Sequence, residues 1–202
     1  MSEIKLLKRK DVDEQKWNNL INGALFSLPY ALTWYLDAVA ENWDALVWKD
    51  YEAVMPLVWL HKMGVKCLYQ PYYCQQLGVF GKAADSESLQ SRFLTEAKKF
   101  AYVNINLNPS SAKVARELNL KPKRNLLLNL NLDYTVLRKA YSDNHKRNIA
   151  KAIKGGQHFA ETVEVESFQK FYLENVNRKK ENFKPQHEKI FKGLTKTLVH
   201  KQ

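Results

Sequence analysis

Cysteine is scarce in this chain, which argues against a fold stabilised by disulfides and against one stabilised by a zinc ion. The 202 residues contain two cysteines, Cys67 and Cys74, too few for a disulfide framework or for a standard four-ligand zinc site. The histidines show neither H-x-x-H nor H-E-x-x-H spacing; they are His61, His145, His158, His187 and His200. We therefore expect no metal site and a fold that depends on its hydrophobic core.

Long apolar runs are also missing. No stretch approaches the roughly 18 apolar residues of a membrane helix, and no apolar h-region of a signal peptide follows the charged residues 1–10. A Walker loop and a Ser/His/Asp order with an elbow motif are absent too. We therefore expect a cytoplasmic protein with no membrane span, and the sequence names no catalytic residue.

Positive charge is concentrated in the last third of the chain. Residues 1–133 hold 17 Lys/Arg and 14 Asp/Glu, whereas residues 134–202 hold 15 and 7. Such an excess attracts phosphates, whether on nucleic acid, on a nucleotide-linked substrate or on a membrane. A lysine-rich helix surface with no ligand is equally compatible with the count.

The order of apolar patterns predicts an α/β protein with a mixed sheet. Two helices should follow the first strand, Ile4–Leu7: one capped by Asp13 and ending at Gly23, the other opened by Pro29. Three strands, a helix, a strand and a short helix should come next; the strands are Ala45–Trp48, Ala53–Leu60, Val65–Tyr69 and Val103–Leu107. Pro56 inside the third strand predicts an edge position or a bulge there.

Four alternating leucines give the strongest strand pattern in the sequence, over Leu126–Leu132. After them the chain predicts a basic helix, Asp143–Lys154, ended by two glycines, and then a strand at His158–Val165. A helix capped by Ser167 and a helix opened by Pro185 should complete the chain. The element order thus restarts, so we expect a first lobe at 1–133, basic connecting helices at 134–156 and a partial second lobe at 157–202.

That order resembles the fold of the GNAT acyltransferases, and two such lobes in tandem resemble the Fem family of aminoacyltransferases. The motif S-D-N-H-K-R-N-I-A-K-A-I-K-G-G over residues 142–156 is similar to the capped basic helix that joins the Fem lobes. Residues 168–180 resemble the helix that follows it, and Trp34-Tyr35-Leu36-Asp37 resembles an aromatic motif of the first lobe. The resemblance implies transfer of an acyl or aminoacyl group to an amine, with acyl-CoA or aminoacyl-tRNA as donor.

Two departures from the family pattern predict a chain that is inactive or incomplete as a transferase. The later strands of the second lobe, where a donor would bind, are missing. The stretch at 75–81 matches the donor loop Q/R-x-x-G-x-G/A except at Phe80, which stands where a small residue is needed for close approach of a phosphate. We therefore expect no cofactor in the first lobe.

An aromatic and amide-rich loop at residues 69–76 is the candidate substrate site, because aromatic faces and amides can stack on and orient a ligand. The candidate substrate-binding residues are Trp34, Tyr35, Tyr72, Tyr73, Gln75 and Gln76. The alternative is a loop that folds its tyrosines onto the edge of the sheet.

The basic helix is the candidate phosphate or nucleic-acid site. Lys146, Arg147 and Lys151 lie on it, and the last two are four residues apart and so share a face. The alternative is an exposed helix that favours cations near its C-terminus. The function that competes with acyl transfer is therefore a non-catalytic basic module that binds tRNA or nucleotide-linked ligands.

The partial second lobe also predicts a homodimer. Without the later strands its apolar positions would form a patch too large to leave exposed; they are Phe171, Val176, Ile190, Leu194 and Leu198. Pairing of residues 157–202 with the same residues of a second copy would cover this patch. The alternative is that these helices pack back on the first lobe.

Overall fold

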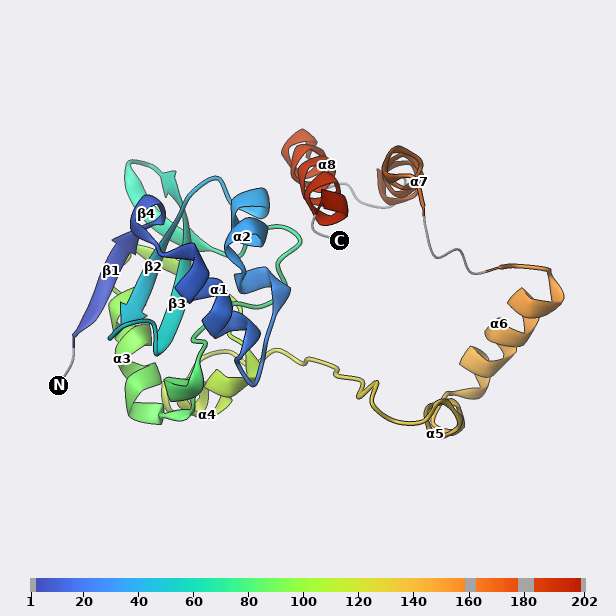
Figure 1. Ribbon diagram of the computed structural model, residues 1–202, viewed down its shortest axis with the longest axis horizontal. Coiled ribbons are helices and arrows are strands. Elements are labelled where there is room, and N and C mark those ends of the chain that lie inside the picture. Colours follow the sequence, from blue (N-terminus) through green and yellow to red (C-terminus); the bar gives the residue numbers. More distant parts are fainter. Residues whose placement is uncertain (1–2, 159–162, 178–183, 201–202) are drawn as a thin grey trace.

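Figure 1 shows the computed structural model, which describes residues 3–158, 163–177 and 184–200. A mixed five-stranded sheet with strand order β1-β2-β3-β4-β5 forms its centre. Neighbouring strands are antiparallel, apart from the parallel pair β4 and β5. The strands are β1 (Ile4–Lys8), β2 (Trp43–Trp48), β3 (Ala53–Lys62), β4 (Val65–Tyr69) and β5 (Tyr102–Asn104). The predicted mixed sheet is thus confirmed.

The helices follow the predicted order closely in the first 120 residues. They are α1 (Glu14–Asn22), α2 (Thr33–Val39), α3 (Glu87–Ala97), α4 (Ala112–Glu117), α5 (Tyr134–Lys139), α6 (Asp143–Lys154), α7 (Val165–Asn177) and α8 (Pro185–His200). Asp13 caps α1 by accepting from the backbone N–H of Lys16, as predicted. Pro29 opens a short 3-10 helix, Pro29–Ala31, and Leu32 with extended backbone separates this turn from α2.

The strands β2 and β3 are apolar on both faces, so helices cover the sheet on both sides. Residues 43, 45, 47, 54 and 58 pack with Trp17 and Leu36 in a cluster under α1 and α2. Residues 46, 53, 55 and 57 pack with Phe93 in a second cluster under α3 and α4. The alternation along each strand divides its side chains between the two clusters. Figure 1 shows the resulting three layers.

Pro56 lies in the middle of β3, an interior strand, so the predicted edge position is wrong. Its register partner on β2 is Ala45. Val54 exchanges two backbone hydrogen bonds with Phe80, on the side away from β2, and alternation points the nitrogen of Pro56 to that same side. There β4 pairs with β3 only from Trp59 onward, so the missing N–H of the proline costs no hydrogen bond of the sheet.

The predicted strand at 126–132 is not formed in this structure. These residues have no regular secondary structure, and Leu126 and Leu127 are 79% and 77% exposed. Alternation sets which side chains share a face, but a strand also needs a neighbouring strand to bond with. The chain leads residues 126–132, hereafter the leucine segment, away from the sheet (Figure 1).

The last third of the chain differs from the predicted second lobe. The predicted strand at His158–Val165 falls largely on residues 159–162, which lie outside the described residues, and residues 157–158 and 163–164 beside them are not in a strand. Ser167 is not a cap, since α7 already begins at Val165. Pro185 opens α8 as predicted. That residues 157–202 form the start of a second lobe stays a prediction.

Gly81 should be the glycine that tolerates a side chain least. Its φ is 114°, and an added Cβ would collide with the carbonyl oxygen of Glu52. Gly81→Ala should therefore lower the free energy of unfolding by about 1–3 kcal/mol, measured by urea denaturation. Gly64→Ala is the matched control, because Gly64 also has a positive φ but its Cβ would meet nothing within 4 Å. Equal losses at the two sites would contradict the packing argument.

Candidate functional site

The predicted substrate residues contact neighbouring parts of the chain, and their role in binding stays a prediction. Tyr35 of α2 is buried in the core, and its hydroxyl donates to the backbone oxygen of Tyr73 at 2.5 Å. Trp34 packs edge-on against Tyr35. Gln76 is buried, whereas Gln75 is exposed and its side-chain amide lies 3.5 Å from that of Asn125. Tyr35, Trp34 and Tyr73 thus contact one another in the folded chain.

The tyrosines of the loop contact the C-terminal helices. Tyr72 stacks on His187 of α8 with ring centroids 3.6 Å apart. Tyr73 lies against Phe191, whose ring stacks on Tyr172 of α7 at 4.1 Å. The loop is thus a docking surface for α7 and α8, which agrees with the alternative that these helices pack back on the first part of the chain.

This docking changes the argument for a dimer. α8 packs against α2, and Leu194 joins the cluster under α1 and α2, so much of the supposedly uncovered apolar face is covered within the chain. Phe171 and Leu198 remain 66% and 42% exposed, and the side chain of Val176 lies outside the described part of the structure. The premise of the dimer prediction is therefore wrong for α8, and the dimer itself stays a prediction.

The stretch that resembles a donor loop, residues 75–81, has its amides committed to the fold. The N–H of Leu77 donates to Asn106 O at 2.8 Å, and that of Phe80 to Val54 O at 2.8 Å. The Phe80 ring is buried in the core. The predicted steric hindrance by Phe80 stays a prediction, and two backbone donors of this stretch are already bonded within the fold.

The basic helix α6 forms as predicted and is exposed along its length. Ser142 caps it by accepting from the backbone N–H of His145. Arg147, Lys151 and Lys154 share one face at spacings of four and three residues. None of the salt bridges between described residues involves a cation of 134–156, and Lys146 contacts only the backbone oxygen of Lys139, at 3.4 Å.

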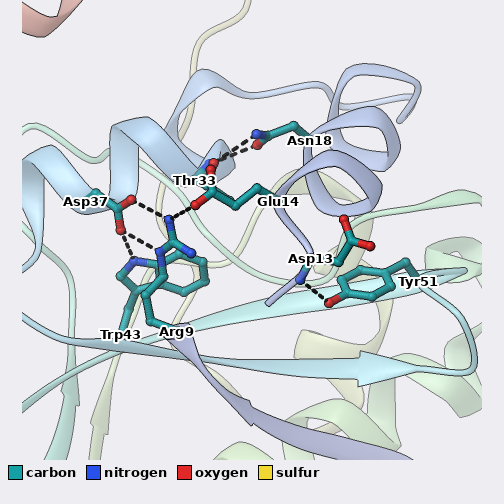
Figure 2. A network of polar contacts seen from close by, with 8 residues as sticks. All are labelled: Arg9, Asp13, Glu14, Asn18, Thr33, Asp37, Trp43 and Tyr51. Atoms are coloured by element: carbon teal, nitrogen blue, oxygen red, sulfur yellow. Dashed lines mark hydrogen bonds and ion pairs between the residues drawn. The ribbon is translucent and has the colours of Figure 1, made fainter. Parts of the chain in front are cut away.

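A network around Arg9 was not found from the sequence, because it joins residues from four separate segments (Figure 2). Arg9 binds Asp37 through two nitrogens, at 2.8 and 2.7 Å, and Glu14 at 2.6 Å. Trp43 donates its indole N–H to Asp37 at 2.8 Å, beneath the guanidinium. The bonds to Asp37 raise the pKa of Arg9 above its ordinary value. The network fixes α1 and α2 against the end of β1.

Two further polar pairs in Figure 2 hold α1 in place. Asn18 exchanges two hydrogen bonds with Thr33 at the start of α2, at 2.9 and 3.0 Å. The backbone N–H of Asp13 donates to the hydroxyl of Tyr51 at 2.7 Å. These bonds satisfy groups at helix ends that would otherwise need water.

An open depression of about 410 Å³ lies beside the Arg9 network. Its lining residues are Lys8, Arg9, Lys10, Asp37, Ala40, Glu41, Asn42, Trp43, Asp44 and Trp59. Asp44 is almost fully buried and accepts from Lys8 at 3.1 Å and from Lys66 at 3.3 Å. Since three cations and three carboxylates line the depression, it offers a polyanion no net charge.

Two negative findings concern the described residues alone. In the part of the chain that the structure describes, no three or more His, Cys, Asp or Glu residues are grouped so that they could hold a metal ion. Among these same residues, no helix has the length and apolar character needed to cross a membrane.

Cys74 in the aromatic loop should resist alkylation in the folded protein. Burial raises the pKa of its thiol to about 12, so the reactive thiolate is rare at pH 8. We expect iodoacetamide to label Cys74 at pH 8 only after unfolding in guanidinium, with the site of labelling identified by peptide mass spectrometry. Rapid labelling of the native protein would show that α8 leaves the loop.

Acetyl-CoA should bind weakly to the isolated chain, because the amides of Leu77 and Phe80 already bond to backbone oxygens. Isothermal titration calorimetry should give no saturable heat at micromolar ligand concentrations. A dissociation constant in the micromolar range would contradict this expectation.

Comparisons with protein-family models, with curated proteins and with solved structures found no match to this chain. The proposal of function is therefore drawn from the places just described: the aromatic loop, residues 75–81, the depression beside Arg9 and the basic helix α6.

Proposed function

We propose that this chain is a non-catalytic module that binds a polyanion, tRNA or a nucleotide-linked ligand, through α6. The observation that carries the proposal is the row of Arg147, Lys151 and Lys154, exposed on one face and without a salt bridge to any described carboxylate. These cations span about 10 Å along the helix. A nucleic-acid strand carries several phosphates over that length.

The surroundings of α6 support a charge-driven contact. Residues 134–156 hold six lysines and arginines and one acidic residue, Asp143, whereas the depression beside Arg9 balances its charges. Unpaired exposed cations attract a polyanion at low cost, because no salt bridge has to break first. The alternative is that cations are stabilising near the C-terminus of a helix. It explains the positions of Lys151 and Lys154 but not those of Arg147 and Lys146.

A transferase function has less support. Acyl transfer needs a site that holds and polarises an activated acyl group. The stretch at 75–81 bonds two of its amides to Asn106 and Val54, and the aromatic loop contacts α8. The resemblance to GNAT and Fem proteins stays a prediction that rests on element order and on the motif at 142–156.

The double variant Arg147→Glu/Lys151→Glu should weaken tRNA binding at least about tenfold at 50 mM salt, as measured by fluorescence anisotropy. The loss should shrink as salt rises, because fewer counterions are released by the variant. The slope of log K against log salt should fall by about 1.5 if two phosphate contacts are lost.

The matched control is Lys5→Glu/Lys62→Glu, which makes the same change in net charge at exposed lysines of β1 and β3. The control should retain most of the affinity. If both double variants lose the same affinity, binding depends on net charge alone and the proposal for α6 is wrong.

A further inference from the structure

Among the described residues, two segments near β5 have backbone groups without a partner strand and apolar patterns that match. One is the outer edge of β5 and the extended residues that follow it. The other is the leucine segment, residues 126–132. An unpaired edge and an unpaired alternating segment are the two components of strand addition.

The outer edge of β5 extends to Leu107. Asn106 directs its backbone groups inward, since its N–H donates to the side chain of Gln70 at 2.8 Å and its carbonyl accepts from Leu77 at 2.8 Å. Alternation then directs the backbone groups of Val103, Ile105 and Leu107 to the outer edge. The side chains of Ile105 and Leu107 pack on the cluster under α3 and α4.

The leucine segment has an apolar face with nothing on it. Leu126, Leu128 and Leu130 are 79%, 62% and 74% exposed. Residues 126–129, which are all described, have no regular secondary structure and no partner strand, whereas residues 130 and 131 form a turn in which the N–H of Asn131 donates to the side chain of Asn129. Exposed apolar side chains at alternate positions favour pairing with a strand.

Two contacts place the start of the leucine segment at the end of this edge. Lys123 donates to the side chain of Asn106 at 2.6 Å, and the side-chain amide of Gln75 lies 3.5 Å from that of Asn125. A chain that turns back after Asn125 would run antiparallel along β5 from its C-terminal end. The segment of the same chain therefore reaches the edge without a long loop to close.

We propose that the leucine segment closes on the outer edge of β5 as a sixth, antiparallel strand of the sheet. With Asn125 opposite Asn106, Leu126 lies opposite Ile105 and Leu128 opposite Val103. Directly opposite residues point to the same face, so the leucines join Ile105 and Leu107 over the cluster under α3 and α4. A shift by one residue would instead place the leucines opposite Asn104 and Asn106 and turn them to the other face.

Closure would also move the basic helix. α5 begins at Tyr134, directly after the segment, and only Ala140, Tyr141 and Ser142 separate it from α6. The open segment holds both helices away from the sheet (Figure 1), and closure draws them toward it. The leucine segment is thus a strap that sets the position of the cations on α6.

Disulfide trapping tests the closed register without any ligand, and so independently of polyanion binding. In Val103→Cys/Leu128→Cys the two residues would face each other in the closed state, at a Cα separation suited to a disulfide, about 5.5 Å. With oxidised glutathione, this pair should form an intramolecular disulfide at least about tenfold faster than Val103→Cys/Leu127→Cys, whose side chains would point to opposite faces. Peptide mapping separates the new bond from Cys67 and Cys74, which are buried.

Each outcome of the trapping decides the proposal. Equal rates for the two pairs would show random collision of an open segment, and a bond between two chains would assign the β5 edge to a second copy; either result overturns closure within the chain.

Amide hydrogen exchange by NMR gives a second measurement on the unmodified protein. Leu126 and Leu128 should exchange at least about tenfold more slowly than Leu127 and Asn129, because only the first two amides face β5. Equal exchange at all four would also overturn the proposal.

Discussion

The rest of the structure depends on the pairing of β2 with β3. Both strands are apolar on both faces, so neither could leave a face in water, and each face needs its own helices. The pair of α1 and α2 covers one face, and α3 and α4 cover the other. Phe80 extends this centre, because its backbone bonds to Val54 tie residues 75–81 to β3. Pro56 lies on β3 at a position where the sheet needs no N–H.

Charge is distributed as unevenly in space as in sequence. In the sheet and its helices, cations are matched locally: Arg9 lies against Asp37 and Glu14, and Lys8 against Asp44. On α5 and α6 the cations form no salt bridge with an acidic residue in the part of the chain that the structure describes. A protein that neutralises charge in one part and leaves it unpaired in another has a preferred place for an anionic partner. This contrast supports α6 over the depression beside Arg9.

Local patterns predicted most elements up to residue 118 because each such element has a nearby stop signal and an apolar stripe. Asp13 caps α1 as expected, and Ser142 caps the basic helix. The basic helix, a part of the candidate site, was predictable for the same reason, since its cap, its cations and its final glycines are contiguous. The Arg9 network was not, because Arg9 and Asp37 come together only when α2 packs beside the end of β1.

The sequence by itself determined which side chains share a face, where most helices begin and where cations accumulate. Only the tertiary structure decided which of these faces find a partner. The leucines at 126–132 have a better alternation than β5, yet β5 is the strand, because β4 lies beside it and nothing lies beside the leucines. Likewise the tyrosines of the aromatic loop, Tyr72 and Tyr73, contact α8, a partner that the local sequence could not name. Periodicity is a property of a few neighbouring residues, whereas hydrogen bonding and burial require a second surface that folding brings from elsewhere in the chain.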